Sequence, residues 1–244
     1  MNEQGQPPVN AGPGGREPVF LLPGAVTAVI GVLVAIHLAS TVVLNPDGYS
    51  QLIFWFAFQP LRIVAAGSDP SLAIPLIWTP FTHALLHGGW EHVLVNAAWF
   101  AIFATPVARR YGAGPMLAIF FISAAAGAAL FAATTLLSGA YLIGASGGVA
   151  GLTGAAVRFI FQPVIVAEHP ETGQRVTVGR RLASFSDLWR DTRARFFILI
   201  WVVLNAAVPL LPLVTGMDMS IAWQAHLGGF FAGILLVGLF ERRS

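Results

Sequence analysis

The chain has 244 residues, of which 56% are hydrophobic and only 10% are charged, whereas soluble domains carry about 25% charged residues. Together with a mean hydropathy of +0.75, this composition excludes an ordinary soluble domain and predicts a polytopic membrane protein. The formal net charge of +2 argues against nucleic acid as a partner, and the absence of cysteine excludes disulfides, thiolate chemistry and cysteine metal sites.

The chain opens with a polar stretch rich in proline and glycine, residues 1–18, which lacks the features of a signal peptide and predicts a disordered cytoplasmic tail. A membrane domain is expected over 19–241, followed by a C-terminal tail at 242–244. Because a spanning helix needs about 20 apolar residues, the charge-free runs of this domain predict six spans. They lie at about 19–44, 91–108, 114–137, 146–161, 196–214 and 220–240.

Two long segments separate these spans. Residues 45–90 are broken by repeated prolines and predict a long external first loop, part of which is apolar enough to lie in the membrane interface. Residues 162–195 predict a cytoplasmic loop between the fourth and fifth spans. Valine-rich runs on either side of 169–173 indicate a β-hairpin there, and apolar residues within 182–189 indicate a short amphipathic helix, although a plain solvated linker is an equal alternative.

The arginines predict how the bundle is oriented. With six spans, every arginine except Arg62 and Arg158 falls in a loop or tail on the side that carries both termini. Since basic residues favour the cytoplasmic side, both termini are expected in the cytoplasm. The predicted fold is therefore an all-α polytopic bundle of six transmembrane helices, and the arginine-only, alanine-rich composition favours a bacterial inner membrane.

Four polar side chains are expected at one depth in three of the spans. Counted from the cytoplasmic ends at about 1.5 Å per residue, Ser146 and His226 both lie roughly 22 Å up, and His92 and Asn96 lie roughly 25 and 20 Å up. His92 and Asn96 are one helical turn apart and share a face. Polar groups inside a bilayer are rare and point to a functional site.

Small residues favour a close approach of the two helices that carry Ser146 and His226. Gly147 and Gly151 in one helix, and Gly229 and Gly233 in the other, follow the spacing that lets helix backbones come together. The two functional side chains are then within hydrogen-bond reach.

This arrangement predicts a serine nucleophile activated by a histidine base. A serine hydroxyl is a poor nucleophile until a base takes its proton, which His226 can do. The nearest carboxylate that could orient the histidine, Asp218, belongs to an outer loop, so we expect a dyad. His92 and Asn96 are suited to donate hydrogen bonds to a developing oxyanion. Alternatively, the serine is a small helix-contact residue, His226 is a core polar group or part of a proton path, and Asn96 bridges two helices.

His83, His87 and His92 also raise the possibility of a metal site. No cysteine or aspartate accompanies them, and zinc sites need a fuller ligand set. We therefore expect no metal and no cofactor, and expect His83 and His87 to tie the first loop to the helices by hydrogen bonds.

Taken together, these motifs resemble the rhomboid intramembrane serine proteases over about 19–240. The resemblance is carried by Phe81-Thr82-His83-Ala84-Leu85-Leu86-His87, His92-x-x-x-Asn96, Gly144-Ala145-Ser146-Gly147 and Ala225-His226-x-x-Gly229-x-x-x-Gly233. It implies a serine endopeptidase whose partners are transmembrane protein substrates and the lipid bilayer. It makes Ser146 the nucleophile and His226 the base, and it places His92, Asn96 and the Ser146 backbone N–H around the oxyanion, with Gly147 and Gly229 as structural residues beside them.

The chain departs from that family at two places. Ala150 stands where the family often has an aromatic residue packed on the histidine, and Pro60-Leu61-Arg62 stands in place of the Trp-Arg pair common in the first loop. Two other functions fit the composition: a rhomboid-like protein that binds membrane clients without cutting them, and a small transporter. Retention of both Ser146 and His226 argues against the first, and the lack of an inverted repeat argues against the second.

Overall fold

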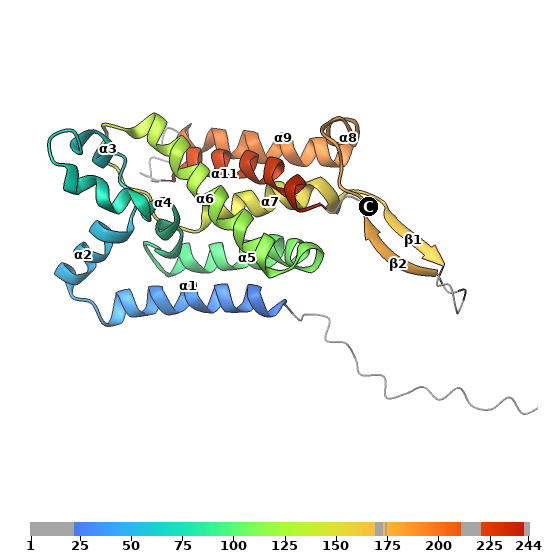
Figure 1. Ribbon diagram of the computed structural model, residues 1–244, viewed down its shortest axis with the longest axis horizontal. Helices are drawn as coiled ribbons and strands as arrows, with labels where there is room; N and C mark the ends of the chain where they lie inside the picture. The colour runs from blue at the N-terminus through green and yellow to red at the C-terminus, as the bar shows by residue number, and fades with distance from the viewer. Residues whose placement is uncertain (1–21, 169–172, 174, 211–220, 242–244) are drawn as a thin grey trace, which may run out of the picture.

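The computed structural model describes residues 22–168, 173, 175–210 and 221–241, which form an elongated bundle of helices with one projecting β-hairpin (Figure 1). The tails expected at 1–18 and 242–244 lie outside the described residues. Among the described residues, four helical segments are long and apolar enough to cross a membrane. They are α1 (Gly24–Val42), α5 (Trp90–Tyr111), α6 (Ala113–Thr135) and the segment Trp223–Phe240, which comprises α11 (Trp223–Leu236) and η4 (Val237–Phe240). The chain is thus an all-α membrane protein in its spanning part.

Two shorter helices complete the bundle. The 15-residue α7 (Ser146–Ile160) is buried at every position from 147 to 159, and it begins where the sequence predicts. A helix that is enclosed by other helices can be shorter than a helix that faces lipid. The 16-residue α9 (Thr192–Ala207), followed by η3 (Val208–Leu210), begins four residues earlier than predicted. The reason is Asp191, whose carboxylate accepts hydrogen bonds from the first backbone N–H groups of α9.

The first loop folds into a series of short helices despite its repeated prolines. It holds α2 (Pro46–Phe56), α3 (Leu61–Ala65), η1 (Pro70–Ile77), α4 (Thr79–Thr82) and η2 (His83–Leu85). The first of these helices begins with a proline, because a backbone N–H is not needed at that position. The preceding Asn45 caps the helix by accepting the Gly48 N–H at 2.8 Å. Arg62 is buried, donates to the Phe54 carbonyl and lies 4.4 Å from the centre of the Phe54 ring. Arg62 thereby joins α3 to α2.

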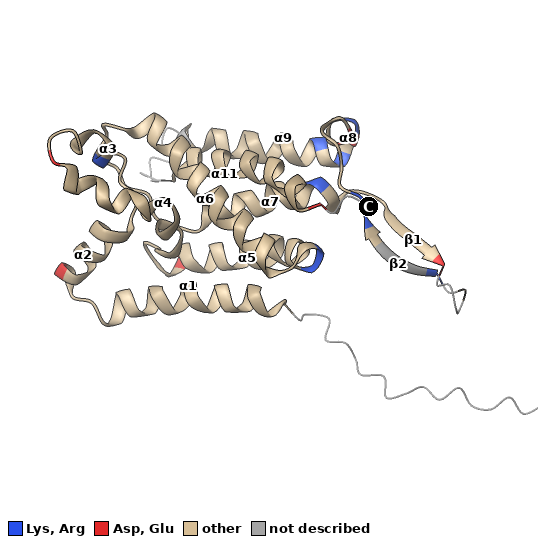
Figure 2. Ribbon diagram, in the orientation of Figure 1, with Lys and Arg blue, Asp and Glu red and all other residues tan. Residues whose placement is uncertain are grey.

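The loop between α7 and α9 contains the two predicted elements. Strands β1 (Val164–Glu168) and β2 (Arg175–Arg180) pair antiparallel, and α8 (Phe185–Arg190) follows, opened by a capping box between Ser184 and Asp187. The hairpin and the short helix are confirmed. Figure 2 shows basic residues of α5, α9 and β2 at this end of the bundle and a basic residue of α3 at the opposite end.

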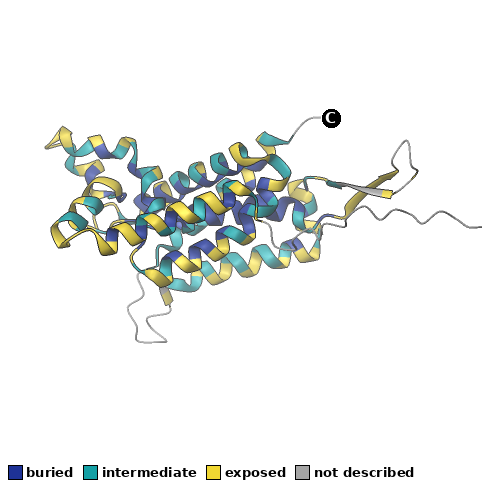
Figure 3. Cartoon of the chain, turned by 90° about the horizontal axis from the view of Figure 1, so that it is seen from below, coloured by how far each residue is buried: buried dark blue, intermediate teal, exposed yellow. Residues whose placement is uncertain are grey.

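Buried residues follow the inner faces of the helices and exposed residues the outer faces (Figure 3). Many of the exposed residues are large and apolar. Exposed Leu38 on α1, Ile102 on α5 and Leu235 on α11 are the kind of surface that lipid covers. At the centre, α7 and α11 approach through their glycines. A Cβ on Gly229 would clash with the carbonyl oxygen of Gly147, and one on Gly233 with that of Gly151. The close approach predicted from the glycine spacing is confirmed.

We expect Gly233→Ala to destabilise the protein. The added methyl has no space against the Gly151 backbone, so α7 and α11 must separate, and overpacking of this kind costs about 1–3 kcal/mol. Gly31→Ala is the matched control, because nothing lies within 4 Å of a Cβ on exposed Gly31 and alanine favours the helix. Thermal unfolding in detergent should show a lower Tm for the first variant alone; equal Tm values would mean that the two helices tolerate separation.

Candidate active site

A sharp turn presents Ser146 at the start of α7. Gly144 has φ +119°, in the region that favours glycine, and a Cβ there would lie 2.7 Å from His92 Nε2. The first helical bond of α7 runs from the Val149 N–H to the Ala145 carbonyl. The Ser146 N–H precedes that bond and belongs to the positive end of the helix dipole. Gly144 therefore brings the hydroxyl, an amide and the His92 ring close together.

The first loop holds this turn through two histidines. The Gly144 N–H donates to the His83 carbonyl at 2.9 Å, and the Ala145 N–H donates to His87 Nε2 at 3.3 Å. His83 in turn donates from Nδ1 to the Thr79 carbonyl at 2.9 Å. Burial lowers the pKa of His83 to about 4 and that of His87 to about 3, the latter with help from the neighbouring His92. Both rings are neutral at neutral pH, as the acceptor role of His87 requires.

A cavity of about 1,020 Å³ brings the four predicted polar residues together between α5, α7, α9 and α11. His92 and Asn96 line it from α5, Ser146 from α7 and His226 from α11. The neighbours of the serine and histidine also meet: a Cβ on Gly147 would lie 3.4 Å from the Ala225 carbonyl oxygen. The structure thus places Ser146 and His226 on the wall of one cavity, where α7 and α11 meet.

The two α5 residues are poised as donors. The Gly88 N–H approaches His92 Nδ1 at 3.4 Å, so Nδ1 is the acceptor and Nε2 carries the proton. Nε2 lies beside the Gly144 turn, and Ser146 Oγ is 3.8 Å from the same Gly144 Cβ position. Asn96 is buried and donates one N–H of its amide to the His92 carbonyl at 2.9 Å, which leaves the second N–H for another acceptor.

One cavity residue was missed from the sequence. Asn205 of α9 lines the cavity, and its Oδ1 lies 2.8 Å from His226 Nδ1. The signal was present, since Asn205 is an amide inside the apolar run 196–207 of α9, where polar groups point to function. Its partner could not be read from sequence, because the rotation of α9 against α11 depends on packing.

No group of three or more histidine, aspartate or glutamate side chains in the described part of the chain is placed to hold a metal ion. The rings of His87 and His92 are 5.0 Å apart at their centres, but His87 Nε2 already accepts the Ala145 N–H. His83, His87 and His92 therefore act in the described structure as hydrogen-bonding groups around the Gly144 turn.

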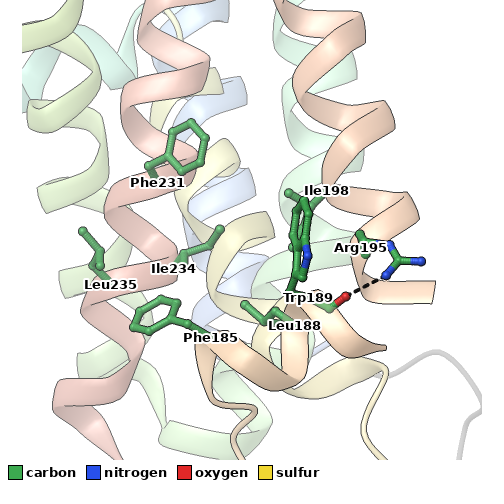
Figure 4. Close-up of a pocket in the computed structure, with 8 residues that line it drawn as sticks. All are labelled: Phe185, Leu188, Trp189, Arg195, Ile198, Phe231, Ile234 and Leu235. Carbon is green, nitrogen blue, oxygen red and sulfur yellow. Dashed lines mark hydrogen bonds between the residues drawn. The ribbon is translucent and has the colours of Figure 1, made fainter. Parts of the chain in front are cut away.

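A second cavity, of about 270 Å³, lies at the hairpin end of the bundle between α8, α9 and α11 (Figure 4). Its walls are apolar except for Arg195, which donates to the Trp189 carbonyl at 2.9 Å. Arg195 is the one charged residue in its described lining, so the larger cavity is the better candidate for a catalytic site.

The sequence of this chain is similar to those of known proteins. The family model described as the Rhomboid domain matches residues 76–243. The chain is 28% identical over 204 residues to the rhomboid protease GlpG of Pectobacterium atrosepticum, a match that covers 84% of this chain and 59% of that protein. It is also 28% identical over 171 residues to the rhomboid protease GlpG of Yersinia enterocolitica, covering 69% of this chain and 50% of that protein. The chain thus spans just over half the length of these relatives, and it belongs to the rhomboid family.

Proposed function

We propose that this chain is an intramembrane serine endopeptidase that hydrolyses peptide bonds in or near transmembrane segments of other membrane proteins. The observation that carries the proposal is the cavity lined by Ser146 at the start of α7, His226 of α11, and His92 and Asn96 of α5. The two GlpG relatives are named rhomboid proteases, which supports the same activity.

In the proposed reaction, His226 takes the Ser146 hydroxyl proton as Oγ attacks the scissile carbonyl carbon. The oxyanion that forms is stabilised by His92 Nε2–H, the free amide N–H of Asn96 and the Ser146 backbone N–H. His226 then gives the proton to the leaving amine as the C–N bond breaks, which leaves an acyl group on Ser146. His226 then takes a proton from a water molecule as its oxygen attacks the carbonyl carbon of the acyl group. The bond to Ser146 Oγ breaks, the acid is released, and His226 returns the proton to Oγ.

The membrane arrangement is part of the proposal. Six spanning helices, formed by α1, α5, α6, α7, α9 and α11 with η4, place the hairpin end and both termini in the cytoplasm of a bacterial inner membrane. The arginines that gather at the hairpin end support this orientation (Figure 2). Residues 19–241 form the membrane domain, with 45–90 outside the cell and 162–195 on the cytoplasmic side, between the tails at 1–18 and 242–244. The Gly144 turn and the cavity then open toward the outer face.

The test is cleavage of a reconstituted transmembrane substrate in liposomes. Wild-type protein should produce two fragments whose masses locate one broken peptide bond, and Ser146→Ala protein should produce none. A protein that binds the substrate in pull-down without cutting it would instead be a non-proteolytic client-binding protein.

We expect EDTA and other chelators to leave the cleavage rate unchanged. Ser146, His226 and the oxyanion donors supply every group that the proposed reaction uses. The rate is measured in liposomes with and without chelator, and zinc is then added back. Loss of activity on chelation with recovery on zinc addition would assign a metal to His83, His87 and His92.

A further inference from the structure

We propose that Asn205 of α9 is a positioning residue that orients His226, so that the site works as a Ser146–His226–Asn205 triad rather than a dyad. This inference rests on the proposed function. Its basis is the 2.8 Å contact between Asn205 Oδ1 and His226 Nδ1, made across two helices inside the cavity that holds Ser146.

A second hydrogen bond fixes which way the Asn205 amide faces. Asn205 Nδ2 donates to the carbonyl of Trp201, one turn earlier in α9, at 2.8 Å. Because the nitrogen is used there, the group that faces the imidazole is the acceptor oxygen. His226 must therefore carry its proton on Nδ1.

That tautomer is the one catalysis needs. With the proton on Nδ1, the Nε2 lone pair is free to accept the Ser146 proton. The oxygen of Asn205 also stabilises the imidazolium that forms when His226 takes up this proton, as the third member of a catalytic triad does. An amide does this without placing a carboxylate at membrane depth, where a charge is costly.

The helix that carries Asn205 is anchored beside the histidine. Trp201 stacks on Phe230 of α11 with ring centres 4.1 Å apart, and Phe230 lies one turn after His226. Ala150 of α7 lines the same cavity but offers only a methyl group to the imidazole. Among the described residues, Asn205 is thus the side chain that holds the ring by a hydrogen bond, and the stack keeps α9 at the distance that the bond requires.

Two substitutions of similar size separate orientation of the histidine from support of the helix. Asn205→Asp keeps an acceptor facing His226 but loses the donor to Trp201, whereas Asn205→Leu loses both. We expect Asn205→Leu to lower kcat by about 10- to 100-fold with KM little changed, the range found when the hydrogen-bond partner that orients a metal-bound histidine is removed. Asn205→Asp should keep most of the wild-type kcat. Asn205→Ala serves if the leucine variant does not fold, and it should be as slow as leucine.

The measurements are kcat and KM on a transmembrane substrate, the rate of labelling by a small fluorophosphonate, and Tm. The small probe does not require a transmembrane helix to enter the cavity, so its rate reports on serine activation alone. Slow labelling of the leucine or alanine variant, restored in Asn205→Asp, is the expected result. Wild-type rates in the leucine and alanine variants would overturn the proposal, as would equal losses in the aspartate and leucine variants, which would assign the role to the Trp201 bond. If wild-type protein neither cleaves nor reacts with the probe, the proposed function itself fails.

Discussion

Ser146→Ala and His226→Ala should each reduce cleavage of a transmembrane substrate by roughly 10⁴-fold or more, to the background of the assay. Serine supplies the atom that attacks, and without the imidazole its hydroxyl keeps its proton at neutral pH. Because the two groups act as a unit, the double variant should be little slower than either single variant. The rates are measured in liposomes at equal protein, with Tm recorded for each variant.

Ser123→Ala is the matched control for this pair. Ser123 lies on α6, is fully buried and packs against Gly151 of α7, so its loss removes a hydroxyl from the same bundle but not from the cavity. It should leave the rate unchanged. Additive losses for Ser146 and His226, or an equal loss for Ser123, would argue that these substitutions act through folding.

Asn96→Ala and His92→Ala should lower kcat by about 10²- to 10³-fold, since the loss of one oxyanion donor costs about 2.7–4 kcal/mol of transition-state stabilisation. KM should change little, because the negative charge that these donors meet develops only in the transition state. Steady-state kinetics on a transmembrane substrate separates the two constants.

Asn96→Asp sharpens this experiment. The aspartate has the size of asparagine but replaces its N–H donors with acceptor oxygens, so it should be at least as slow as the alanine variant. A kcat near wild type in Asn96→Asp would show that neither N–H of Asn96, the one bonded to the His92 carbonyl or the free one, is needed for turnover.

The helical core could be predicted because its signals are local. Apolar runs predicted the four helical segments that are long enough to span, and the Gly144 turn before Ser146 predicted the start of α7 at the observed residue. Spacing alone also predicted that Gly229 and Gly233 would pack against the backbone of α7. The depth argument, which needs only helix rise, brought Ser146, His226, His92 and Asn96 to one cavity.

The features that could not be predicted from the sequence depend on contacts between distant segments. The helices of the first loop are set partly by bonds such as Trp78 Nε1 to the Trp55 carbonyl, 2.7 Å across 23 residues. The start of α9 is set by the Asp191 cap, outside the apolar run that was used to predict it. Asn205 reaches His226 from the same face of α9 that carries Trp201, which stacks on Phe230 of α11. Periodicity contains no information on the rotation of α9 against α11.

The central claim, that Ser146 is a nucleophile activated by His226, is tested most directly by mapping a fluorophosphonate adduct. The wild-type protein is labelled in detergent, digested and sequenced by mass spectrometry. The account predicts a single adduct on Ser146, absent in Ser146→Ala and formed far more slowly in His226→Ala. An adduct on another serine, or cleavage of substrate that persists in Ser146→Ala, would contradict it.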